Sequence, residues 1–240
     1  MKQLLYIITF FMSSSIFSQT ISIGLFEKGY AIEIRTKKAY EKKYGVGNVT
    51  VNYYGDNYNT PYSILKTNDV VIVNTFFKND LTQTLADNII KCYKDNIHIV
   101  LTTEGSRLVT GERFSSYVWN EITGESISET PGGAYGTQSP PRFHPSSGPG
   151  GLSTNSNLIW SSTSYTSFGD LNPKNVLHQR TEDRPDCGNV EGLDALFPHL
   201  PKTGEGTIYI NGEIYYPFYS TGSEVEDLAD NIVTLHLINE

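Results

Sequence analysis

The first half of the chain alternates between short apolar runs and polar, helix-prone stretches. The apolar runs predict strands, and they cover Thr20–Glu27, Asn48–Gly55, Asp69–Phe77 and Ile97–Glu104. Between them, Thr36–Tyr44 is charged and predicts a helix that ends at Gly45. Pro61–Asn68 predicts a short helix or turn. Because Asp69–Phe77 is apolar almost throughout, it is typical of a strand buried on both faces.

The stretch after the third run has the pattern of an amphipathic helix. Leu81, Leu85, Ile89 and Cys92 recur at helical spacing, and Asp80 with Gln83 matches a capping box at its start. Strands that alternate with helices predict βαβ units, which form a parallel sheet covered by helices on both faces. The predicted fold class is therefore α/β, with a doubly wound, mostly parallel sheet.

The pattern stops between about residues 111 and 187, where Gly, Ser, Pro and Thr dominate. We expect no regular structure over most of this stretch, apart from an edge strand within residues 157–168. Such a length is either a functional insertion folded over the domain or a linker. Its aromatic residues favour the insertion, because a linker has little reason to carry them.

Regular patterns return near the C-terminus. Val190–Pro201 predicts a short helix stopped by proline, and Gly206–Ser220 predicts a hairpin turned at Asn211-Gly212. Ser223–Asn239 predicts a final helix that opens with a capping box at Ser223 and Glu226. Residues 19–240 are expected to form a single domain.

The first eighteen residues resemble a bacterial secretory signal peptide. Lys2 precedes a short apolar run, and small residues follow it up to a predicted cleavage near Ser18. No cysteine follows for a lipid anchor, and no later segment has the composition of a membrane span. The predicted location is therefore secreted, periplasmic or at the cell surface.

Charge narrows the range of partners. The net charge is −8, and it becomes −9 once the segment containing Lys2 is removed. An acidic chain without a basic stripe argues against nucleic acid and against anionic lipid as partners. An extracellular small molecule or a glycan is the expected ligand.

Two cysteines remain, Cys92 and Cys187. In an oxidising compartment such a pair predicts a disulfide. The alternative is that Cys92 is a buried thiol on the apolar face of its helix.

The order of elements resembles the class I glutamine amidotransferase-like superfamily, a flavodoxin-like fold, and especially its ThuA-like domains. The resemblance covers about residues 20–107 and 190–239. It implies a cysteine nucleophile on a G-x-C-x-G turn after a strand and a later H-x-E. The corresponding stretches here read "TTEGSRL" and "YYPFYSTGSEVED", which contain neither the cysteine nor the histidine. The resemblance therefore implies the fold without amidotransferase activity.

Candidate site residues gather where the predicted strands end, since open α/β sheets bind ligands there. Glu104, Ser106 and His178 are the candidates for catalysis. The expected ligand-binding residues are Glu27, Thr75, Glu104, Ser106, Arg107, His144, Trp160 and Arg180. At each of these positions a solvated cap or a self-paired polar loop is the structural alternative.

No metal or cofactor is expected. No pair of histidines has metal-ligand spacing, and neither a phosphate-binding loop nor a calcium loop is present in the sequence. The leading hypothesis is a secreted, noncatalytic ligand-binding or accessory module, with carbohydrate as one ligand class. One alternative is a secreted hydrolase that uses Ser106 or Glu104 with His144 or His178. Another is a structural surface or adhesion protein.

Overall fold

The first four strands form the parallel part of one sheet. The computed structural model describes residues 20–27, 32–132, 142–145, 160–161, 165–180, 190–198 and 205–212. The strands are β1 (Ile21–Glu27), β2 (Val49–Gly55), β3 (Val70–Phe76) and β4 (His98–Glu104), and they confirm the four predicted strands. They lie in the order β2-β1-β3-β4, and β11 (Ile208–Asn211) extends the parallel sheet beside β4.

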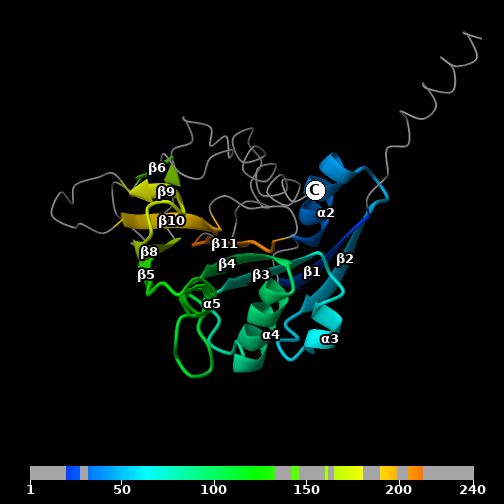
Figure 1. Ribbon diagram of the computed structural model, residues 1–240, viewed down its shortest axis with the longest axis horizontal. Helices are drawn as coiled ribbons and strands as arrows, with labels where there is room; N and C mark the ends of the chain where they lie inside the picture. The colour runs from blue at the N-terminus through cyan, green and yellow to red at the C-terminus, as the bar shows by residue number, and fades with distance from the viewer. Residues whose placement is uncertain are drawn as a thin grey trace, which may run out of the picture.

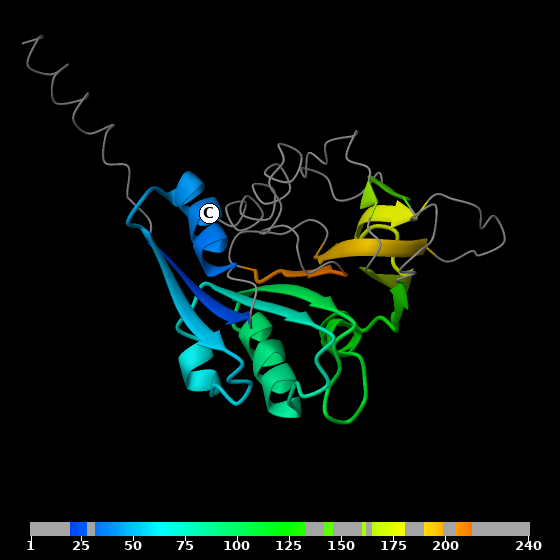
Figure 2. The ribbon, with the colours of Figure 1, turned by 180° about the vertical axis from the view of Figure 1, so that it is seen from behind.

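Helices cover both faces of this sheet, as predicted. On one face, α2 (Glu33–Tyr44) buries Tyr40 against strand residues such as Leu25 and Ile72. On the other face lie α3 (Tyr62–Leu65) and α4 (Gln83–Lys94), whose apolar side chains form a second core cluster. Figures 1 and 2 show α2 on one side of the strands and α3 and α4 on the other.

The start of α4 differs from the predicted capping box. Thr82 is the N-cap, and its Oγ1 accepts a hydrogen bond from the Leu85 N–H at 3.1 Å. Gln83 instead donates to Asp87 Oδ1 and to the Tyr117 hydroxyl. The capping box at Asp80 is therefore wrong, because the helix begins three residues later than that residue.

The second half of the sheet is antiparallel, and the sequence predicted only one edge strand of it. Its strands are β5 (Ser128–Gly132), β6 (Arg142–Pro145), β7 (Trp160–Ser161), β8 (Tyr165–Leu171), β9 (Val176–Arg180) and β10 (Val190–Phe197). β10 joins the two halves, since it pairs with β11 and β8 along one edge and with β9 along the other. The order beyond β10 is β9-β6-β7, while β5 pairs with β8.

The expectation of a structureless stretch over residues 111–187 is wrong. Within it the structure places α5 (Phe114–Thr123) and the strands β5 to β9. Their short length and small polar residues hide the periodicity, and pairing with other strands supplies the backbone hydrogen bonds instead. The predicted edge strand within residues 157–168 is confirmed, because β7 ends the strand order.

Of the predictions for the C-terminal segments, the structure confirms the strand within Gly206–Ser220, as β11, but not the helix at Val190–Pro201. Val190–Phe197 is strand β10 and not a helix. It lies between other strands, so tertiary pairing decides its conformation. β11 pairs with β4 along one edge and with β10 along the other. It therefore has no edge left to pair with the second strand of the predicted hairpin at Asn211-Gly212. The predicted helix at 223–239 and the predicted signal peptide at 1–18 lie outside the described residues.

Cys92 is a free thiol buried in the core beneath α4. Burial raises the pKa of this thiol to about 12. The structure thus shows the buried-thiol alternative and not the predicted disulfide, because Cys92 lies on the apolar face of α4 that packs into the core. Cys187 lies outside the described residues. Among the helices that are described, none is long and apolar enough to cross a membrane.

Candidate functional site

A row of polar side chains crosses six neighbouring strands on one face of the sheet. Strand register pairs Glu27 with Asn74, Asn74 with Thr102, Thr102 with Asn211, Asn211 with Asp194, and Asp194 with His178. Partners in register point to the same face. These six residues, called the polar row below, come from β1, β3, β4, β11, β10 and β9. Each is at most 2% exposed.

The neighbouring row on the same face is apolar. One pleat earlier along the parallel strands, the register joins Leu25, Ile72, Val100, Tyr209 and Leu196. These five residues, called the apolar row below, pack beneath α2. The face therefore changes from apolar to polar in a single step, at the carboxyl ends of the parallel strands. Ligands of open α/β sheets bind outside these ends.

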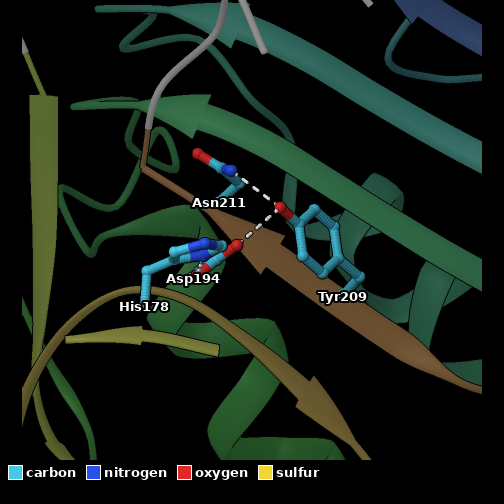
Figure 3. A network of polar contacts seen from close by, with 4 residues as sticks. All are labelled: His178, Asp194, Tyr209 and Asn211. Atoms are coloured by element: carbon cyan, nitrogen blue, oxygen red, sulfur yellow. Dashed lines mark hydrogen bonds and ion pairs between the residues drawn. The ribbon is translucent and has the colours of Figure 1, made fainter. Parts of the chain in front are cut away.

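Direct hydrogen bonds link the members of the polar row. Asn74 Nδ2 donates to Thr102 Oγ1 at 2.7 Å. At the other end, Asp194 is the centre of a network that Figure 3 shows. His178 Nδ1 lies 2.9 Å from Asp194 Oδ1, and the Tyr209 hydroxyl donates to Asp194 Oδ2 at 3.0 Å. Asn211 Nδ2 donates to the same hydroxyl at 2.7 Å.

The network fixes the orientation of His178. A carboxylate only accepts hydrogen bonds, so the proton of the imidazole lies on Nδ1, facing Asp194. Nε2 is then the ring nitrogen that does not face this carboxylate. A buried carboxylate that orients a histidine in this way is the arrangement found behind many catalytic and ligand-binding imidazoles.

The corner after β4, where the resemblance places a nucleophile, is occupied by Gly105. Gly105 has φ +62°, a conformation that other residues adopt at a cost. A Cβ at this position would lie 2.6 Å from a ring carbon of Phe77. Its N–H donates to Thr166 Oγ1 at 2.9 Å, and its carbonyl accepts from Arg113 at 2.7 Å. The corner is thus closed to a nucleophilic side chain at residue 105.

The Ser106 hydroxyl lies on the α4 side of the sheet, away from the polar row. Ser106 is fully buried, and its Oγ accepts hydrogen bonds from Thr75 Oγ1 at 2.9 Å and from the Lys78 N–H at 3.2 Å. Thr75 lies on the α4 side of the sheet, because alternate residues Val71 and Val73 pack there. Ser106 and Thr75 therefore join β3 to the β4 corner. Within the described chain, no histidine is a hydrogen-bond partner of Ser106.

Glu27 and Glu104 lie on the other face, with the polar row. Glu27 is the first member of the row, and the Tyr53 hydroxyl donates to its backbone carbonyl at 2.7 Å. Glu104 follows Thr102 by one pleat, and its carbonyl accepts from the Phe77 N–H at 2.8 Å. Arg107 leaves the corner, and its guanidinium donates to the Gly111 carbonyl. The structure thus brings Glu27, Glu104 and His178 to one face and turns Thr75 and Ser106 away from it.

The remaining predicted residues lie on the antiparallel strands. Phe143 pairs with both Trp160 and Arg180, and His144 pairs with Gln179. Trp160, His144 and Arg180 are therefore on adjacent strands β7, β6 and β9, and Arg180 follows His178 by two residues. The position of their side chains lies outside what the structure describes.

A partly buried carboxyl outside the polar row, that of Glu129, lies at the start of α5. Glu129 Oε2 accepts a hydrogen bond from the Ser116 N–H at 3.1 Å. This bond supplies a cap for α5, which has no side-chain cap at Arg113. Burial raises the pKa of Glu129 to about 7, although the Ser116 N–H and the Arg113 and Arg107 guanidiniums act in the opposite direction.

Sequence reasoning missed Asn74, Thr102, Asp194, Tyr209 and Asn211. A usable signal existed for three of them. Asn74, Thr102 and Asn211 are each a polar residue that follows directly on an apolar strand run. Asp194 was hidden because its segment was assigned to a helix. Neither the polar row nor any other described part of the chain holds three metal-ligating side chains together.

No protein-family model, curated protein or solved structure matches this chain. The fold and the polar row therefore carry the functional argument.

Proposed function

We propose that the chain is a secreted, noncatalytic ligand-binding module with a flavodoxin-like, glutamine amidotransferase-like fold. The parallel strand order β2-β1-β3-β4-β11 corresponds to the 2-1-3-4-5 order of flavodoxin-like sheets, which supports the fold assignment. Under this proposal the excursion between residues 111 and 187 is an insertion that adds the antiparallel strands.

The polar row is the observation that carries the proposal. Burying polar groups costs free energy unless every group finds a partner, and even then the net gain over apolar side chains is small. Six such residues in register, at the edge where ligands bind, are better explained by recognition than by stability. The closed corner at Gly105 supports a role without the nucleophile of the resembled enzymes.

Carbohydrate is the ligand class that the polar row favours. Its members offer carboxylate, amide, hydroxyl and imidazole groups, which exchange hydrogen bonds with sugar hydroxyls. None of the six is Lys or Arg, so the row lacks the cations that recognise phosphate or carboxylate groups. The net charge of −8 also disfavours a polyanionic ligand.

The test is a thermal-shift screen of the purified chain against neutral and acidic oligosaccharides, nucleotides and divalent metals. A ligand at about 100 times its Kd adds roughly 2.7 kcal/mol, which corresponds to a rise in Tm of about 5–10 °C for a chain of this size. We expect a shift with an oligosaccharide that Asp194→Asn abolishes. The matched control is Thr207→Val, just before β11. It removes a buried hydroxyl that lies 2.9 Å from the Nδ1 of His98, at the amino end of β4 and away from the polar row.

The orientation of His178 by Asp194 favours a second function, a hydrolase in which His178 acts as the general base toward a water molecule. This version replaces the expected Ser106 nucleophile, because the Ser106 hydroxyl is bonded to Thr75 and to the Lys78 N–H, on the other face of the sheet from His178. It predicts turnover of ester or glycoside substrates that Asp194→Asn lowers by at least 100-fold. Binding of a glycan without turnover by the wild-type chain would contradict the hydrolase and support the binding module.

A further inference from the structure

Phe77 has an unusual backbone conformation at the carboxyl end of β3. Its φ is +45°, in the left-handed region that bulky residues rarely adopt. The other described residues with positive φ that are not glycine are Asn96 and Asp170, and these types tolerate the conformation. Strain of this kind at an aromatic residue persists only where the surrounding structure holds it, and it concentrates at functional sites.

The strained conformation does not serve to bury the ring. The Phe77 N–H donates to the Glu104 carbonyl at 2.8 Å, which fixes the backbone. One side of the ring lies against Gly105, where a Cβ would come within 2.6 Å of it. Its edge contacts Phe76, with the ring centroids 4.5 Å apart. Nevertheless 47% of the Phe77 surface remains exposed.

Hydrogen-bond donors lie close to this exposed ring. The Arg113 guanidinium reaches the Gly105 carbonyl at 2.7 Å, directly beside the ring's contact with Gly105. The backbone N–H of Arg107 also lies near, since it donates to the carbonyl of Lys78, the residue after Phe77, at 2.6 Å. An aromatic surface with the Arg113 guanidinium beside it therefore lies at the carboxyl ends of β3 and β4.

We propose that Phe77 is the stacking platform for a pyranose ring of the bound glycan, held in place by the Gly105 corner. This inference rests on the proposed binding function and names the part of the site that contacts the sugar. A pyranose has an apolar face of C–H groups, which packs on an aromatic ring, and a rim of hydroxyls, which accept hydrogen bonds from guanidinium groups. Both requirements are met at Phe77.

The test measures glycan affinity by isothermal titration calorimetry with cellohexaose, mannohexaose, xylohexaose, an oligogalacturonate and adenosine as probes. Phe77→Gly removes the ring and relieves the strain, because glycine accepts positive φ. We expect it to weaken binding of the preferred oligosaccharide by at least tenfold while Tm stays the same or rises. Phe77→Tyr is expected to retain affinity within threefold.

Ile64→Ala is the matched control, since Ile64 on α3 is 46% exposed and lies away from the corner. It is expected to leave affinity unchanged. If Phe77→Gly binds like the wild type while Asp194→Asn does not, the stacking role is overturned and the binding function stands. If the wild type binds adenosine and none of the sugars, the pyranose is overturned and a binding module remains. If the wild type binds none of the probes, both proposals are overturned.

Discussion

The apolar row and the polar row lie one pleat apart on the same strands, yet burial stabilises the fold in the first and gains little in the second. Each buries its side chains almost completely. Removing apolar surface from water stabilises the fold by roughly 25 cal/mol per Å², so Leu25, Ile72 and Val100 need no further explanation. Buried Asn74, Thr102 and Asp194 gain little over apolar residues of the same size. The comparison shows that burial alone does not account for the polar row.

Tyr209 is the residue that joins the two rows. Its ring packs with the apolar row beneath α2, while its hydroxyl bonds both Asp194 and Asn211. The core therefore positions the network at one end of the polar row. A rigid apolar layer beneath a polar one is the arrangement expected of a preorganised site.

The largest effect is expected from Asp194→Ala. Removing this carboxylate leaves the His178 imidazole and the Tyr209 hydroxyl without their partner in a buried place. Breaking such a network costs about 3–5 kcal/mol. Urea denaturation followed by circular dichroism measures the change, with Asp194→Asn as the milder variant. A loss below about 1 kcal/mol would show that the network contributes little to the fold.

The next effect concerns His98, a buried histidine one pleat before the apolar row whose Nδ1 lies 2.9 Å from Thr207 Oγ1. Burial lowers its pKa from 6.5 to about 4. The unfolded chain therefore binds more protons between these values, so the stabilisation is fully present above pH 6.5 and is lost as the pH falls toward 4. The change reaches up to about 3 kcal/mol.

Denaturation of the wild type and His98→Gln at several pH values checks this. The free energy of unfolding of the wild type is expected to fall more steeply than that of the variant between pH 6.5 and 4. Parallel curves for the two proteins would mean that His98 titrates normally in the folded chain.

Smaller effects are expected when a polar residue is placed in the apolar row or apolar residues are placed in the polar row. The first change is expected to lower stability, and the second to abolish ligand binding with little change in stability. Val100→Thr places a hydroxyl in the apolar row and is expected to cost about 1–3 kcal/mol, because the group loses water without gaining a designed partner. The double change Asn74→Leu with Thr102→Val removes both members of a hydrogen bond from the polar row. It is expected to alter stability by less than about 1 kcal/mol and to abolish ligand binding.

Denaturation together with calorimetric binding separates these outcomes. If the double variant lost several kcal/mol, the polar row would be a stabilising feature in its own right. The contrast between the rows would then disappear.

The smallest effect is expected at Glu129, a carboxyl outside the row that accepts a hydrogen bond from the Ser116 N–H. Its pKa is raised from 4.5 to about 7, so the folded chain binds more protons and stability is lost as the pH rises through this range. Glu129→Gln keeps an acceptor for the Ser116 N–H and removes the charge. We expect about 1 kcal/mol of stabilisation at pH 8 and none at pH 4, measured by thermal unfolding at both values. Equal effects at the two pH values would assign the change to packing.

The sequence predicted the parallel half of the sheet because the hydrophobic pattern within each segment there is enough to indicate a strand or a helix. An uninterrupted apolar run such as residues 70–73 is most stable as a strand when both faces of the sheet are covered. The stripe of Leu85, Ile89 and Cys92 fixes the face that α4 buries. The antiparallel half lacks such patterns: Ser128–Gly132 becomes β5 only because β8 supplies its hydrogen bonds.

The candidate site was predicted in part for the same reason. Glu27 and Glu104 end apolar runs, so their place at the edge of the sheet followed from the sequence. Ser106 also follows such a run, but the turn at Gly105 directs it toward Thr75 and into the interior. Asp194 could be found only once β10 was placed between β11 and β9, because its own segment reads equally well as a helix.

The sequence by itself determined the α/β class, the four parallel strands and the helices α2, α3 and α4, since these depend on the periodicity of side chains along each segment. Tertiary structure alone decided the antiparallel strands, the free thiol at Cys92 and the assembly of the polar row. Register between strands brings Glu27 and His178, about 150 residues apart in the chain, into one line. Hydrogen-bond partners so distant in sequence leave no local pattern, because each strand contributes only one residue to the row.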